Sequence, residues 1–180
     1  MPTIQYTREH LMDLLSTEGD PLIPILDDAV AHPDKYVDRE STRLLFEQGA
    51  SKLADIENIP HLTYTTYRNV QRFTDRRPYQ AVRVDRRTKT ALAAMKVILG
   101  DDGYLNLLHD YLWVTCEETN WLLPQVDHMG IELRVPATAL SLAEIIVSLS
   151  DKIEDKAQTR VRQEIEDRVL IPYLRHPNGY

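Results

Sequence analysis

Two adjacent carboxylates, Glu117 and Glu118, lie where a predicted helix ends. Paired carboxylates can divide acid–base work, with one group giving up a proton while the other stays ionised. Neighbouring residues of a helix point about 100° apart, so these two can share one proton site only if the helix has already ended. Negative charge at a helix C-terminus is unfavourable because it opposes the helix dipole, so a functional role is one explanation for the two carboxylates at this position. Solvated charges at a helix end are the simpler interpretation.

Two tryptophans flank this acidic pair, with Trp113 before it and Trp121 shortly before Pro124. Large amphipathic rings placed where a helix breaks often line a groove for a flat, hydroxylated ligand such as a sugar. Packing in the core explains many such rings as well. We predict that Trp121 stacks on a sugar ring, with packing as the alternative.

His109, Trp113 and Cys116 fall on one face of the same predicted helix, at i, i+4 and i+7. One histidine and one cysteine are too few ligands for zinc, and no second pair has suitable spacing. Nothing around Cys116 in the sequence is typical of a reactive thiolate. We therefore predict a buried packing seam and no metal site.

His128 lies in the loop expected after the second tryptophan, between Asp127 and Glu132. Loop histidines near a groove can act as general bases or contact a substrate. The sequence has no Gly-rich phosphate loop, no Ser/His/Asp constellation and no HExxH motif. We predict no cofactor, and these residues alone do not define a reaction.

Basic residues are concentrated in one part of an otherwise acidic chain. The net charge is −7, which argues against nucleic acid as a partner. A basic island in an acidic protein can mark an anion-binding face. The alternative is that its arginines pair with carboxylates of neighbouring helices. The island comprises Arg68, Arg72, Arg76, Arg77, Arg83, Arg86, Arg87 and Lys89, interrupted by Asp75 and Asp85.

The elements that must position these residues are helices. No stretch has the two-residue alternation of a half-buried strand, so the class is all-α. Short links favour antiparallel neighbours, as in a hairpin array, a bundle or a toroid. Gly100 is a natural stop for the longest helix, and residues 124–136 should form a loop or a short extended piece. Helices are predicted over 7–16, 21–31, 39–56, 63–75, 78–99, 103–117, 138–149 and 155–174, the last bending at Pro172.

Length and composition place the chain among single-domain proteins. Its 180 residues, 43% of them hydrophobic, can bury one sizeable core. A single cysteine excludes an intramolecular disulfide. The first residues lack the features of a signal peptide, and no apolar run is long enough to span a membrane. We expect a soluble, cytoplasmic protein that does not interact with membranes.

Three blocks of this sequence resemble the N-terminal helical region of the heparinase II/III-like polysaccharide lyases. The similarity covers residues 20–180 in outline, and the second block is the most specific. The blocks run from Ile59-Pro60 through Thr63-Tyr64, Tyr67-Arg68 and Asp75 to Tyr79 and Arg86-Arg87; from Leu99 through Gly100, Asp101, Tyr104, Trp113, Cys116-Glu117-Glu118 and Trp121 to Pro124; and from Ile131-Glu132-Leu133 through Thr138-Ala139 to Arg168 and Pro172.

This resemblance implies an incomplete (α/α) toroid that is followed, in a larger protein, by a β-sandwich domain. Such enzymes cleave uronic-acid polysaccharides by β-elimination. A base removes the proton next to the carboxylate, a second group stabilises the enolate-like charge, and an acid protonates the departing oxygen. The family takes these roles from Asn, His and Tyr residues beyond the matched region. We therefore expect residues 1–180 to form one helical domain that holds part of a substrate groove and is inactive alone.

The expected partner is an acidic polysaccharide or oligosaccharide. Arginine forks suit its carboxylate or sulfate groups, and a tryptophan suits its rings. The predicted substrate contacts are Trp121 for stacking, Arg68, Arg76 and Arg87 for anionic groups, and Glu117 and His128 as further candidates.

The sequence departs from the family pattern in two places, and both departures affect the substrate contacts that the resemblance implies. Members often carry Pro-Ala-His after the second tryptophan, whereas here Gln125-Val126 follow Pro124. Where Ile-Asp-Leu is common, this chain has Ile131-Glu132-Leu133.

The alternative function is a non-catalytic helical module that forms homo-oligomers through exposed apolar helix faces.

Overall fold

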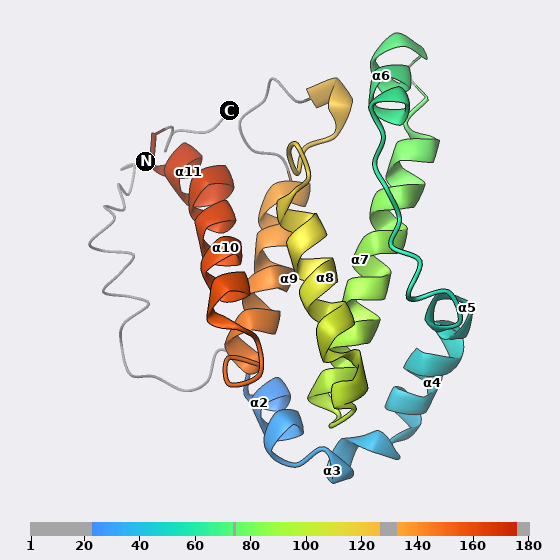
Figure 1. The fold of residues 1–180 in the computed structure, drawn as a ribbon, viewed down its shortest axis with the longest axis vertical. Coiled ribbons are helices and arrows are strands. Elements are labelled where there is room, and N and C mark those ends of the chain that lie inside the picture. The colour runs from blue at the N-terminus through green and yellow to red at the C-terminus, as the bar shows by residue number, and fades with distance from the viewer. Residues whose placement is uncertain (1–22, 74, 127–132, 176–180) are drawn as a thin grey trace, which may run out of the picture.

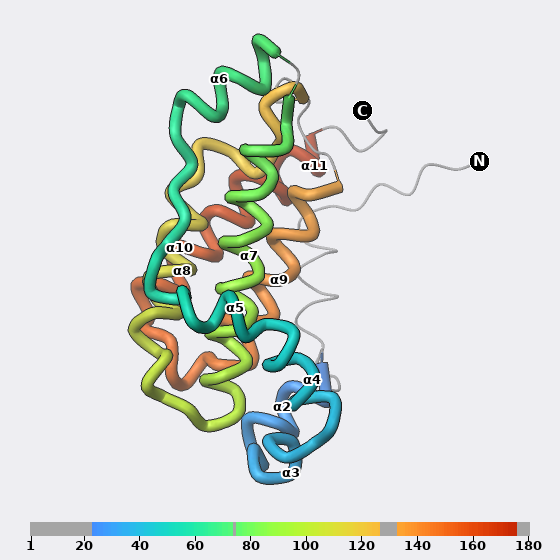
Figure 2. The backbone as a smooth tube through the Cα atoms, turned by 90° about the vertical axis from the view of Figure 1, so that its right-hand side faces the viewer, coloured from blue at the N-terminus to red at the C-terminus, as the bar shows by residue number. Residues whose placement is uncertain are grey.

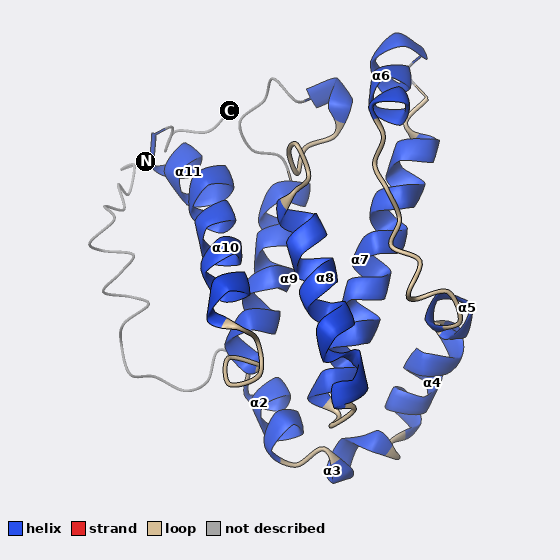
Figure 3. Ribbon diagram, viewed as in Figure 1, coloured by secondary structure: helices blue, strands red, loops and turns tan. Residues whose placement is uncertain are grey.

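The computed structural model describes residues 23–73, 75–126 and 133–175 (Figures 1 and 3). These residues form helices and connecting turns without a strand, which confirms the predicted all-α class. The elements are α2 (Pro24–Ala31), α3 (Asp34–Val37), α4 (Glu40–Gln48), α5 (Ala50–Leu53), α6 (Tyr64–Phe73), α7 (Arg77–Ile98), η1 (Asp102–Tyr104), α8 (Leu105–Cys116), η2 (Pro124–Val126), α9 (Arg134–Ser148), α10 (Asp155–Ile165), η3 (Glu166–Leu170) and α11 (Ile171–Arg175).

Two antiparallel hairpins form the body of the molecule, as the short links predicted (Figure 1). α7 packs along α8, and α9 packs along α10. The two hairpins contact each other through α10, which also packs against α8. α2 closes one end by contacting both α7 and α9.

The end of α7 follows the expected glycine stop. Gly100 has φ +89°, a conformation that costs a residue with a Cβ atom about 1–2 kcal/mol. Its N–H donates to the carbonyl of Val97 at 3.1 Å, and that of Asp101 donates to Lys96 at 2.9 Å. These two bonds form a Schellman motif, which satisfies carbonyls that the helix itself leaves open.

The prediction of one helix over 39–56 is wrong in detail, because α4 and α5 are separate. Gly49 lies between them, and a Cβ atom there would come within 2.8 Å of the Leu92 side chain of α7. The break therefore lies where the backbone is close to the Leu92 side chain of α7.

α9 also begins earlier than the sequence predicts. The helix begins at Arg134 rather than 138, and Pro136 lies in its first turn. A proline is tolerated there because the first N–H groups of a helix have no partner within the helix. A bend was predicted at Pro172, and the structure has a π-helical turn, η3, just before α11, which contains this proline. Such a turn relieves the conflict between a proline and the carbonyl four residues earlier.

The main core lies between the two hairpins and includes residues of α2, α7, α8, α9 and α10. Ala93, Val97, Leu108 and Leu112 are completely buried there. The segment between α5 and α6 runs beside α7 (Figure 2). None of the helices in the described ranges is long and apolar enough to cross a membrane.

Candidate functional site

A buried cluster of charge lies at the end of α8. Glu118 has a side chain that is only 1% exposed. Arg86 Nη1 donates to its Oε1 at 2.9 Å, and Arg87 Nη2 donates to its Oε2 at 2.8 Å. Arg83 Nε lies 3.9 Å from the same Oε2. The three arginines share one carboxylate because their spacing puts them on one face of α7.

The remaining donors of this cluster bind backbone carbonyls. Arg83 donates to the carbonyls of Trp121 and Leu122 at 2.7 and 3.1 Å. Arg86 Nε donates to that of Pro60 at 3.1 Å. α7 is thereby tied to the chain after α8 and to the segment before α6. For these arginines, pairing with a neighbouring carboxylate is the reading that the structure supports.

Lys89 makes a second buried anchor on α7. It is 1% exposed, and its Nζ donates to the carbonyls of Asp55 and Asn58 at 2.7 and 2.9 Å. Nζ also contacts Asp55 Oδ2 at 3.0 Å, and this hydrogen bond lowers the pKa of the Asp55 carboxyl group. The basic island therefore contributes to folding as well as to the surface.

A groove of about 500 Å³, here called the tyrosine groove, opens beside this cluster, between α6 and the end of α8. Tyr64 and Tyr67 stack with centroids 6.4 Å apart and planes inclined by 22°. Tyr79 meets Tyr67 edge to face. The lining residues are His61, Leu62, Thr63, Tyr64, Tyr67, Tyr79, Arg86, Val114, Glu117, Glu118 and Thr119.

The rings of this groove differ in exposure. Tyr64 is 73% exposed, whereas Tyr79 is buried at the base. Burial raises the pKa of the Tyr79 phenol, so this group is protonated at neutral pH. Glu117 Oε1 accepts a hydrogen bond from Trp113 Nε1 at 3.0 Å, which holds the carboxylate beside the groove. The Arg68 guanidinium lies 5.8 Å from the centroid of the Tyr64 ring.

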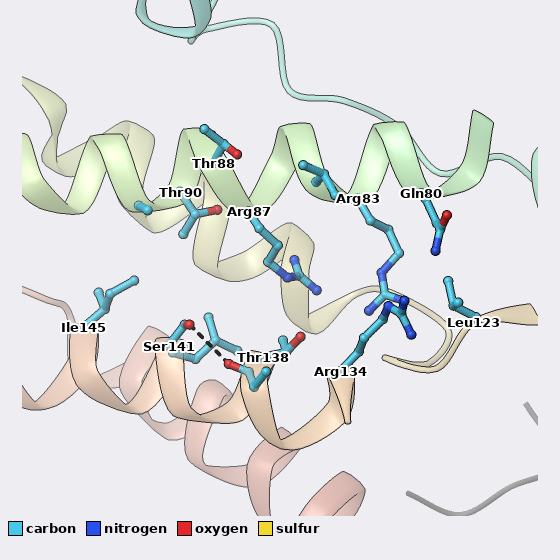
Figure 4. Close-up of a pocket in the computed structure, with 14 residues that line it drawn as sticks. Gln80, Arg83, Arg87, Thr88, Thr90, Leu123, Arg134, Thr138, Ser141 and Ile145 are labelled. Carbon is cyan, nitrogen blue, oxygen red and sulfur yellow. Dashed lines mark hydrogen bonds between the residues drawn. The ribbon is translucent and has the colours of Figure 1, made fainter. Parts of the chain in front are cut away.

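A second groove of about 530 Å³, here called the α7/α9 groove, lies between those two helices (Figure 4). Its wall is largely aliphatic, with arginines toward one end. Among the described residues, the two grooves share no lining residue. The lining residues are Gln80, Arg83, Val84, Arg87, Thr88, Thr90, Ala91, Leu123, Arg134, Ala137, Thr138, Ser141, Leu142 and Ile145.

The predicted role of Trp121 does not fit its position. This tryptophan is 1% exposed, and its Nε1 donates to the carbonyl of Thr115 at 3.0 Å. The Arg168 guanidinium covers the ring at 5.0 Å from its centroid. Trp121 is a core residue in this structure and offers no face to a sugar, so the packing alternative holds.

The three arginines predicted to bind anionic groups do not converge. Arg68 lies next to the tyrosine groove, and Arg87 lines the α7/α9 groove. Arg76 is exposed at the start of α7. Glu117 does line the tyrosine groove. His128 lies outside the described residues.

The sequence analysis missed the tyrosines as site residues. In the sequence, Tyr64 and Tyr67 belong only to the blocks that carry the family resemblance. Their spacing of three residues on a helix was the available signal, because it places both rings on one face. Their proximity to Glu117 depends on how α6 packs and has no signal in the sequence.

The predicted buried seam of His109, Trp113 and Cys116 is correct only for Cys116, because Trp113 is 37% exposed and His109 is half-buried. Cys116 is 1% exposed, and burial raises the pKa of its thiol to about 11. His109 Nε2 accepts the backbone N–H of Glu154 at 3.0 Å, so it joins α8 to the start of α10. Among the residues described, no group of three or more His, Cys, Asp or Glu side chains is arranged to hold a metal ion.

The chain matches no protein-family model, no curated protein and no solved structure. Its function must therefore be argued from the grooves themselves and from the residues that line them.

Proposed function

We propose that this chain binds an acidic polysaccharide in the tyrosine groove, as the helical part of a heparinase II/III-like lyase. The observation that carries the proposal is the set of three tyrosines beside a carboxylate and a histidine in one groove. The proposal keeps the ligand expected from the resemblance but replaces the predicted stacking residue, Trp121, with Tyr64.

Exposed aromatic rings suit the flat apolar faces of sugars. Tyr64 presents most of its surface to solvent, and Tyr67 packs nearly parallel to it. A ring already held by a neighbour loses little freedom when a ligand stacks on it. Phenol groups also donate and accept hydrogen bonds, as sugar hydroxyls require.

Recognition of the acidic groups is assigned to Arg68. Its guanidinium lies 5.8 Å from the centroid of the Tyr64 ring, which lines the groove. A planar guanidinium can bind a carboxylate or sulfate through two parallel hydrogen bonds. Glu117 and His61 add groups that accept hydrogen bonds from sugar hydroxyls.

β-Elimination needs a base, a group that stabilises the enolate-like charge and an acid. The tyrosine groove contains titratable groups, but we assign no catalytic role to them. Under the proposal, the catalytic residues belong to another part of a larger lyase, and the described helices contribute substrate binding. The arrangement of consecutive antiparallel hairpins is compatible with a segment of an (α/α) toroid.

The test is the affinity of purified protein for two uronic-acid oligosaccharides, one from alginate and one from heparin. We expect Tyr64→Ala to weaken binding by about three- to tenfold, which corresponds to the roughly 0.5–1.5 kcal/mol of an aromatic contact. Tyr173→Ala is the control, because Tyr173 is also exposed but lies on α11. Equal affinities for the two variants, or no binding of either ligand, would refute the assignment. The ratio between ligands reports whether sulfation matters.

The alternative is a helical module that associates with helices rather than with sugars. One observation favours it: Leu140 and Val147 of α9 and Leu133, its N-cap residue, are exposed and recur every seven residues. Apolar stripes of this kind are typical of helix–helix contacts. Glycan binding should weaken steeply from roughly 0.05 to 0.5 M salt, whereas apolar association should not.

A further inference from the structure

The exposed face of α8 continues from the tyrosine groove toward the start of that helix. Asn106, Asp110, Trp113 and Glu117 are all exposed, and their spacing places them in one row. This row, here called the α8 strip, is roughly 16 Å long at the rise of an α-helix. Glu117, at one end of the strip, lines the tyrosine groove. The strip therefore extends the surface on which we place the glycan.

A polar groove of about 690 Å³ opens at the other end of the strip, between α8 and the end of α5. Asn106 and Asp110 line it from α8, and Asp55 and Glu57 line it from the opposite side. Asp55 is paired with Lys89, but among the described residues no cation forms an ion pair with Glu57 or Asp110. Carboxylates and amides accept hydrogen bonds from sugar hydroxyls, whereas carboxylates repel a uronic acid.

Trp113 supplies an aromatic ring within the strip. Its side chain is 37% exposed, and its Nε1 donates to Glu117 Oε1 at 3.0 Å, so the edge of the indole is held next to the tyrosine groove. Lys156, an exposed residue of α10, has its Nζ 5.9 Å from the centroid of the ring. An exposed cation–π contact of this length is weak, so Lys156 can leave the ring when a sugar stacks on it. An indole fixed at its edge suits the apolar face of a sugar.

The charge beside the ligand changes sign between the tyrosine groove and the strip. Arg68 lies next to Tyr64, whereas the strip presents the carboxylates of Glu117 and Asp110. Lys156 adds no net positive charge, because Asp155 precedes it in the same turn of α10. A uronic acid beside Arg68 gains an ion pair, but on the strip it faces like charges. Repulsion between two such charges in contact corresponds to about fivefold in affinity.

We propose that the α8 strip is a subsite for an uncharged sugar unit, next to the acidic unit bound in the tyrosine groove. Trp113 stacks on the ring of this unit, and Glu117 and Asp110 accept hydrogen bonds from its hydroxyls. The inference rests on the proposed function, because it extends the same ligand beyond the tyrosine groove. It narrows that ligand to an oligosaccharide in which some units carry no negative charge.

The first experiment is calorimetric titration of the purified protein with two hexasaccharides. The hyaluronan hexasaccharide carries a carboxylate on every second unit, and the alginate hexasaccharide carries one on every unit. We expect hyaluronan to bind at least about threefold more tightly at low salt, because it can place an uncharged unit on the strip. The difference should shrink from roughly 0.05 to 0.5 M salt, since salt screens the repulsion between exposed carboxylates.

Variants locate the subsite. Trp113→Ala should weaken hyaluronan binding by about three- to tenfold, whereas Tyr173→Ala, on exposed α11, should not. Glu117→Gln keeps an oxygen that accepts from Trp113 but removes the charge. It should strengthen alginate binding by at least about twofold without strengthening hyaluronan binding. Glu40→Gln changes the net charge equally on exposed α4, and it should leave the ratio of the two affinities unchanged.

Two results would overturn the subsite. These are unchanged hyaluronan binding by Trp113→Ala, and equal effects of Glu117→Gln on the two hexasaccharides. If Tyr64→Ala weakens binding and Trp113→Ala does not, the proposed function stands and the subsite alone fails. If neither hexasaccharide binds, the proposed function fails and the subsite fails with it. The circular dichroism of each variant shows whether it is folded.

Discussion

A single carboxylate, Glu118, organises the residues around both grooves. Arg86 binds one of its oxygens and contributes to the tyrosine groove, while Arg87 binds the other and contributes to the α7/α9 groove. A buried carboxylate is favourable only when cations and hydrogen bonds replace its water. The burial of Glu118 next to exposed Glu117 therefore decides which member of the acidic pair is structural.

Replacing Glu118 tests this role. We expect Glu118→Gln to lower the free energy of unfolding by about 3–5 kcal/mol, because buried guanidinium groups then lack their counter-ion. Glu117→Gln is the matched control, since Glu117 is the exposed neighbour of Glu118, and it should change stability by less than about 0.5 kcal/mol. Urea denaturation of both variants makes the comparison. Similar midpoints would show that the ion-pair cluster contributes little.

Asp55 supplies a prediction on pH. Its hydrogen bond with Lys89 lowers its pKa below 3.8, so the folded state binds this proton more weakly than the unfolded state does. The stabilisation is therefore complete above the unfolded pKa and is lost as pH falls through the lower, folded value. Wild type and Asp55→Asn should differ in melting temperature at pH 6, and the difference should shrink below about pH 4.

The control for this titration is Asp151→Asn, in an exposed turn between α9 and α10. It should follow wild type across the whole pH range. A difference between wild type and Asp55→Asn that stays constant down to the lowest pH would contradict the assigned linkage.

At the scale of elements, α7 is the helix that holds the surrounding segments in place. It begins with Pro78 in its first turn and ends in the motif at Gly100. Between these points its buried face includes Arg83, Arg86 and Lys89. Their long side chains reach segments that have little regular structure of their own, so the connection from α5 to α6 is held by α7.

The glycine stop can be tested separately. Gly100→Ala should destabilise the fold by about 1–2 kcal/mol, because alanine must adopt the left-handed conformation there. Gly103→Ala is the matched control, since no positive φ occurs at that position. Thermal denaturation followed by circular dichroism measures both. Equal effects would mean that local packing, rather than backbone conformation, makes a side chain unfavourable at position 100.

At the scale of the molecule, α9 presents an apolar face beside the α7/α9 groove. Leu140 is 55% exposed, and Leu133 and Val147 lie one heptad to either side of it. We expect the protein to self-associate through this face at high concentration, because such a stripe gains burial in a helix–helix contact.

Leu140→Lys should return the sedimentation mass to the 20.8 kDa of one chain. Tyr173→Lys removes an exposed hydrophobic residue of α11 and should leave association unchanged. Association that survives Leu140→Lys would place the contact elsewhere. High salt should not dissociate the oligomer, whereas it should weaken the binding of an acidic glycan.

The sequence by itself determined the helical class, the hairpin order and the stop at Gly100. Helical periodicity and the conformational freedom of glycine are local properties, so they can be read from neighbouring residues. The spacing of Trp113 and Cys116 did not determine which of them is buried, because Cys116 lies in the core whereas Trp113 is 37% exposed.

Only the tertiary structure decided which polar and aromatic residues reach a surface. Trp121 and Arg87 had the residue types of ligand contacts, yet the first is buried and the second is bound to Glu118. Tyr64 became a candidate because α6 is placed across from the end of α8. Burial and charge pairing depend on contacts between residues distant in sequence, which no local pattern contains.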